Sequence, residues 1–123
     1  MMNQFNKTIA SFGYAFKGLA TLIKEERNAR IHLIATVLVI IAGVYFNLNL
    51  IEWCLIIFAI GLVFIVETIN TVIENIMDYQ SSEKDPKIAK IKDLAAAAVL
   101  IAAIVAAAIA CFVFGSKIWL ELK

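Results

Sequence analysis

Polar side chains that can do chemistry interrupt an otherwise apolar stretch, in the sequence VETINTVIEN at residues 66–75. Glu67, Asn70 and Glu74 are spaced three and four residues apart, so on an α-helix they share one edge. The same edge continues to Asp78. Glu67 and Glu74 would lie roughly 10 Å apart along the helix axis, too far to hold one ion directly but suited to the two ends of one extended ligand.

The helix that carries this edge must hold Glu67 at the membrane boundary. Only 14 uncharged residues separate Glu52 from Glu67. At a rise of ~1.5 Å per residue they span about 21 Å, less than the hydrocarbon layer of about 30 Å. A carboxylate costs ~2.5 kcal/mol or more at mid-bilayer and is usually retained only for a functional or pairing role. We therefore expect a functional role for Glu67.

A second acidic position precedes the first long apolar stretch. Glu26, in KEERNARIH, meets the same membrane boundary from another helix, so Glu26 and Glu74 can jointly hold a hard cation. Two carboxylates with phosphate oxygens and water suit Mg²⁺. Lys92 and Asp93 add a cation and a carboxylate on this side, and together these groups indicate phosphoryl transfer. The alternative for Glu74 and its neighbour Asp78 is solvation, or pairing with Lys92 or Arg30.

The composition predicts one all-α membrane domain over residues 1–123, because 63% of the residues are hydrophobic. Apolar residues at helical spacing predict an amphipathic surface helix at about residues 4–25. We expect three membrane-spanning helices, at about residues 29–46, 50–78 and 89–116. The last is rich in alanine, which favours close helix packing at the centre of an oligomer.

Basic residues indicate the orientation in the membrane. They cluster before the first span and again between residues 84 and 92, whereas residues 47–52 contain none. The positive-inside rule therefore places the N-terminus and the 79–92 loop in the cytoplasm.

The soluble nucleotide-binding motifs give no match. Gly13 and Gly18 have the spacing of a P-loop, but Leu19 and Ala20 follow where Lys and Ser or Thr are required. His32 is the only histidine in the sequence, so we expect it to make a structural hydrogen bond rather than to bind a metal ion. A carboxylate-lined proton or cation transporter is an alternative function, which the confinement of the polar edge to the cytoplasmic half disfavours.

The motif E-x-x-N-x-x-x-E of residues 67–74, followed by Asp78 and by KDLAAAAVLIA from Lys92, resembles the small integral-membrane lipid kinases of bacteria, which include diacylglycerol kinase and undecaprenol kinase. GYAFKGL and ERNARIH are similar too, so the resemblance covers nearly the whole chain. It implies a homotrimer in the bacterial cytoplasmic (inner) membrane, with active sites at subunit boundaries and phosphorylation of a lipid hydroxyl that depends on ATP and Mg²⁺. ERNARIH favours undecaprenol as the substrate, with diacylglycerol as the alternative.

The resemblance also implies roles for individual residues. Glu67 is the general base, Asn70 orients it, and Glu26 and Glu74 hold the Mg²⁺ bound to ATP. The positions that resemble ATP contacts are Lys7, Tyr14, Glu26, Glu74, Glu83, Lys84, Asp85, Lys92 and Asp93. Those that resemble lipid contacts are Lys7, Tyr14, Glu67 and Ala96. Lys7 replaces an arginine common in some members, and Asp85 and Pro86 depart from the loop of the diacylglycerol enzymes.

Overall fold

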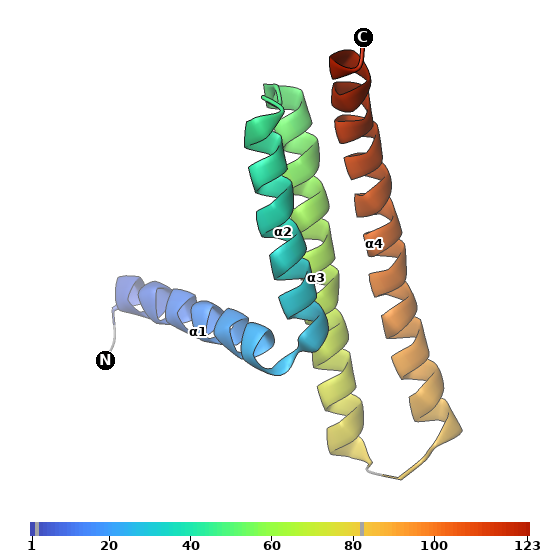
Figure 1. Cartoon of the computed structure of the whole chain (residues 1–123). Helices are drawn as coiled ribbons and strands as arrows, with labels where there is room; N and C mark the ends of the chain where they lie inside the picture. Colours follow the sequence, from blue (N-terminus) through green and yellow to red (C-terminus); the bar gives the residue numbers. More distant parts are fainter. Residues whose placement is uncertain (2, 82) are drawn as a thin grey trace.

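The computed structural model describes residues 1, 3–81 and 83–123, and the regular secondary structure in that part of the chain is all helical. Its four helices are α1 (Gln4–Glu25), α2 (Arg27–Tyr45), α3 (Leu50–Gln80) and α4 (Pro86–Glu121) (Figure 1). Helices α2, α3 and α4 are each long and apolar enough to cross a membrane. The all-α class with one additional helix and three membrane helices, predicted from the sequence, is confirmed.

Helices α2 and α3 lie side by side, α4 packs along α3, and α1 points away from this bundle (Figure 1). The α1–α2 corner and the α3–α4 connection lie toward one end of the bundle, and the α2–α3 turn and the C-terminus lie at the other. Phe5, Phe12 and Phe16 are exposed along α1. Because these aromatic residues of α1 are left exposed by the described residues, the helix suits the membrane surface.

A single residue, Glu26, separates α1 from α2. Its backbone is extended, with φ −97° and ψ 118°. Its N–H donates to the carbonyl of Leu22 at 2.9 Å, and its own carbonyl accepts from the N–H of Arg30 at 3.3 Å. The Arg30 side chain donates to the carbonyls of Ile23 and Lys24 at 3.1 and 2.8 Å. These acceptors have no partner within α1, so the arginine ties the end of one helix to the start of the next.

A capping box closes the turn at the opposite end. The Asn49 side chain accepts from the N–H of Glu52 at 3.0 Å, and the Glu52 carboxylate accepts from the N–H of Asn49 at 2.8 Å. Glu52 also pairs with Lys117 of α4 at 2.9 Å. Within the turn, Asn47 has a φ of 51°, a left-handed conformation that asparagine adopts more readily than most residues. The start of α3 is thus held to the preceding turn and to α4.

Close packing of α2 against α3 depends on Gly43. A Cβ at this position would lie 2.6 Å from Cη2 of Trp53, so only glycine lets the indole approach so closely. The buried residues Leu48, Ile56 and Val113 form a small apolar core beside this contact.

Helix α4 is longer than the predicted 89–116, because it starts earlier at Pro86 and ends later at Glu121. The Asp85 side chain caps it by accepting from the N–H of Lys87 at 2.7 Å. Proline fits the first helical position, where a backbone N–H would have no partner. This start brings the first turn of α4 into the connection with α3.

Candidate active site

The polar edge of α3 is buried in its middle. Glu67 is 1% exposed and Asn70 is 7% exposed, the two buried polar side chains of the described residues. Three side-chain oxygens on this edge are buried and have no hydrogen-bond partner among the described residues: Glu67 Oε2, Asn70 Oδ1 and Thr71 Oγ1. Each unpaired buried group costs about 1–3 kcal/mol, so three on one edge point to a site for a ligand from outside the chain.

Ionisable side chains from three segments lie near Glu67. Nε2 of His32, in α2, lies 4.0 Å from Glu67 Oε2. Glu26 and Glu74 are near enough for their charges to act on the Glu67 carboxylate. The structure therefore brings Glu67, Asn70 and Glu74 of α3 into one region with the corner residue Glu26.

A groove of about 640 Å³ lies between α1 and α3. Tyr14 and Glu26 line it from the side of α1 and the corner, and Thr71 and Asn75 line it from α3. One wall therefore carries a carboxylate, and the other carries an unpaired hydroxyl one turn from Glu67. This α1–α3 groove can accept an extended polar ligand beside the buried edge.

A second groove, of about 620 Å³, lies at the α3–α4 connection. Its charged lining residues are Asp78, Glu83, Lys84, Asp85 and Lys92. Lys92 forms an ion pair with Asp78, which is the alternative pairing that the sequence left open for this acid. The groove carries three carboxylates against two lysines, so its lining alone has no excess of positive charge for an anionic ligand such as a nucleotide.

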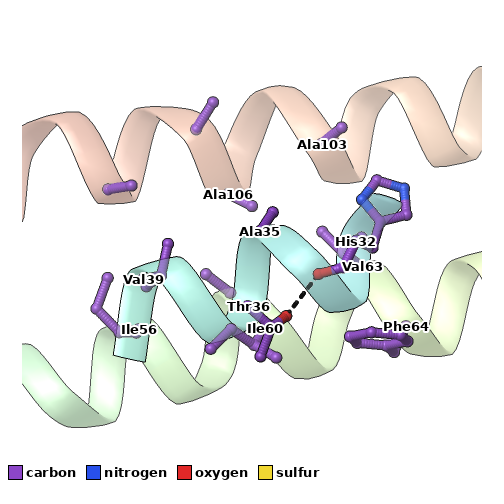
Figure 2. Close-up of a pocket in the computed structure, with 13 residues that line it drawn as sticks. His32, Ala35, Thr36, Val39, Ile56, Ile60, Val63, Phe64, Ala103 and Ala106 are labelled. Carbon is purple, nitrogen blue, oxygen red and sulfur yellow. Dashed lines mark hydrogen bonds between the residues drawn. The ribbon is translucent and has the colours of Figure 1, made fainter. Parts of the chain in front are cut away.

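A third space is an apolar cavity of about 230 Å³ between α2, α3 and α4 (Figure 2). Figure 2 shows His32 at one end of this cavity, with Ala103 of α4 and Val63 and Phe64 of α3 nearby. The alanines of α4 that face it are Ala103, Ala106, Ala107 and Ala110. Small side chains leave space for an apolar chain at membrane depth, beside the region of Glu67.

Five of the predicted contact residues line neither of the two grooves nor the cavity: Lys7, Glu67, Glu74, Asp93 and Ala96. Of these, Lys7 of α1 and Asp93 and Ala96 of α4 are exposed. Conversely, sequence reasoning gave no functional role to Thr71 or His32. Thr71 shares the helical edge of Glu67, so its spacing could have identified it. The contact of His32 depends on the register of α2 against α3, which the spacing does not define.

The carboxylates of Glu26 and Glu74 suit a metal ion that also binds water and phosphate oxygens, rather than one enclosed by protein side chains. Among residues 1, 3–81 and 83–123, no three or more Asp, Glu, His or Cys side chains cluster closely enough to hold a metal alone. Both glutamates are partly exposed. Two carboxylates that face water suit Mg²⁺, which retains water and phosphate oxygens as its other ligands.

Known proteins resemble the chain over most of its length. Residues 13–114 match the family described as prokaryotic diacylglycerol kinase. The undecaprenol kinase of Bacillus subtilis (strain 168) is 34% identical over 116 residues, covering 94% of each chain. The diacylglycerol kinase of Escherichia coli (strain K12) is 34% identical over 112 residues, covering 91% of this chain and 92% of the relative. The diacylglycerol kinase of Synechocystis sp. is 38% identical over 99 residues, covering 80% of this chain and 57% of the relative.

Proposed function

The chain belongs to the prokaryotic diacylglycerol kinase family and is a lipid kinase, and we propose that it transfers the γ-phosphate of ATP to the hydroxyl of a membrane lipid alcohol. The observation that carries the proposal is the buried carboxylate of Glu67, which has an unpaired oxygen in a helix that can cross a membrane. An apolar cavity lies beside its region, and the α1–α3 groove, which is lined by both polar and apolar side chains, adjoins the same edge of α3.

Glu67 is the general base of the proposed reaction. Its carboxylate accepts the proton of the lipid hydroxyl while the hydroxyl oxygen bonds to the γ-phosphorus. The bond from that phosphorus to the β–γ bridging oxygen breaks, and ADP leaves with the bond's electron pair. Asn70 lies three residues further along the same edge, so its side chain can orient Glu67. The products are the lipid phosphate, ADP and a proton on Glu67.

The nucleotide approaches from water and binds further out along α3. Glu26 and Glu74 would hold a Mg²⁺ ion, which when bound neutralises charge on the phosphates. The remaining ATP contacts that we propose are Lys7, Tyr14, Glu83, Lys84, Asp85, Lys92 and Asp93. Four of these line the groove at the α3–α4 connection, and Tyr14 lines the α1–α3 groove. The lipid contacts of the proposal are Lys7, Tyr14, Glu67 and Ala96.

Undecaprenol is the substrate that we favour, with diacylglycerol as the alternative. The ERNARIH segment supports this choice, and the similarity to an undecaprenol kinase extends over 94% of both chains. A diacylglycerol kinase with the same 34% identity keeps the second lipid as an alternative.

We further propose a homotrimer in the bacterial cytoplasmic membrane with the N-terminus in the cytoplasm. The basic clusters support the orientation, since the N-terminal helix and the α3–α4 connection lie toward the same end of the bundle (Figure 1). Large apolar side chains are exposed along α2, α3 and α4 of the single chain, and neighbouring subunits can cover part of this surface.

A phosphate-transfer assay tests the function. Purified protein in micelles receives labelled ATP and Mg²⁺, with undecaprenol and diacylglycerol in parallel. We expect Glu67→Gln to lower kcat by about 10²–10⁴-fold, the contribution typical of general base catalysis. Glu52→Gln, at the other end of α3, is the matched control and should retain transfer. If neither lipid gains phosphate, or if Glu67→Gln equals the wild type, the proposal is wrong.

A further inference from the structure

We propose that His32 is a positioning residue for Glu67, whose imidazole holds the carboxylate in the orientation that receives the proton of the lipid hydroxyl. This inference rests on the proposed function of Glu67 and adds a second side chain to it. Sequence spacing assigned His32 only a structural hydrogen bond. The structure instead directs Nε2 of this single histidine toward the unpaired oxygen of the buried acid.

The distance and the missing partner support this role together. Glu67 Oε2 accepts no hydrogen bond from the described residues, and His32 Nε2 lies 4.0 Å from it. A hydrogen bond between nitrogen and oxygen needs about 2.9 Å, so a closing movement of roughly 1 Å would form it. Catalytic contacts are often this loose before substrate binds. The imidazole is therefore placed to donate Nε2–H to the carboxylate.

The two side chains differ in access to the apolar cavity. His32 is 22% exposed and lines the cavity, whereas Glu67 is 1% exposed and is not among the residues that line it. The imidazole thus lines one end of the apolar cavity (Figure 2) and also lies 4.0 Å from the Glu67 carboxylate.

A contact with α3 restrains the ring, and a hydrogen bond within α2 engages the backbone carbonyl of the same residue. The edge of the His32 ring packs against Phe64, with 6.5 Å between the ring centroids and 74° between the planes. Thr36 donates to the backbone carbonyl of His32 at 2.8 Å, shown as the dashed line in Figure 2. The acids whose charges act on Glu67 are Glu26, at the corner between α1 and α2, and Glu74, further along α3. An imidazole donor can offset the repulsion that these charges exert on an ionised Glu67.

A spectroscopic experiment tests the contact without kinase activity. Protein labelled with ¹⁵N-histidine, in micelles and with any purification tag removed, gives imidazole signals from His32 alone because the chain has one histidine. We expect Glu67→Gln to shift these signals and Glu52→Gln to leave them unchanged. Unchanged signals in Glu67→Gln would overturn the inference, whatever the kinase assay shows.

Kinetics then separate a positioning role from a merely structural one. Gln retains an amide group near the place of Nε2, whereas Asn does not reach it. We expect His32→Asn to lower kcat by roughly 10–100-fold, as expected for a misplacement of about 1 Å, with the lipid KM within twofold. His32→Gln should retain most of kcat. Equal losses in the two variants, or full activity in both, would overturn the positioning role.

A double-mutant cycle gives the last criterion. If His32 acts through Glu67, His32→Asn should lower the residual activity of Glu67→Gln by less than twofold. The same large loss in both backgrounds would show an independent effect and overturn the inference. Absence of transfer by the wild type would instead refute the proposed function, while the ¹⁵N signals would still report the contact.

Discussion

Replacing Glu67 with glutamine should stabilise the protein while it removes activity. The side chain is 1% exposed, and one of its carboxylate oxygens has no partner among the described residues. An unpaired buried polar group costs about 1–3 kcal/mol. A carboxylate at the bilayer centre costs ~2.5 kcal/mol or more, and less toward the interface. Glutamine has nearly the same shape without the charge, so we expect the free energy of unfolding to rise by about 1–2 kcal/mol.

The measurement is equilibrium unfolding in mixed micelles, followed by far-UV circular dichroism at fixed protein concentration. Glu52→Gln is the matched control, and it should change stability in the opposite direction. Its carboxylate completes the capping box with Asn49 and pairs with Lys117 at 2.9 Å. If Glu67→Gln were destabilised like Glu52→Gln, Glu67 would have a stabilising partner. The argument that its burial costs stability and serves function would then fail.

Three further changes test packing, capping and metal binding. Gly43→Ala should destabilise the fold by about 1–3 kcal/mol in thermal unfolding, because its Cβ would lie 2.6 Å from the Trp53 ring. Gly61→Ala, with nothing within 4 Å of the added Cβ, is its control and should not destabilise. Asn49→Ala should cost about 1 kcal/mol in the same assay through loss of the capping box, and an unchanged midpoint would contradict this. Chelating Mg²⁺ should abolish transfer reversibly, and Glu74→Gln should raise the Mg²⁺ concentration for half-maximal rate by roughly tenfold or more. An unchanged Mg²⁺ requirement would remove Glu74 from the metal site.

Composition and spacing predicted the features that depend on one helix at a time. The apolar lengths indicated three membrane helices, because a span needs about 20 residues. The 3.6-residue period placed Glu67, Asn70 and Glu74 on one edge. The length of the apolar run before Glu67 also indicated its depth. Each of these inferences uses only the rise and the pitch of a helix.

Contacts between helices could not be predicted from the sequence in the same way. The approach of His32 to Glu67 depends on the register of α2 against α3, which the capping box at Asn49 and the close contact at Gly43 determine. The early start of α4 followed from the cap at Asp85, which the prediction assigned to the loop. Proximity across helices depends on such local contacts, and these leave little periodic signal in the sequence.

Glu26 is the single extended residue between α1 and α2, so it is the point about which α1 would turn. Helix α1 has 22 residues and is therefore a rigid arm about 33 Å long. A swing of roughly 3 Å at its far tip, as lipid headgroups rise and fall, turns the pivot by only about 5°. A movement at the far end of α1 therefore produces only a small rotation at Glu26, so movements of the membrane surface there would turn the backbone at Glu26 only slightly.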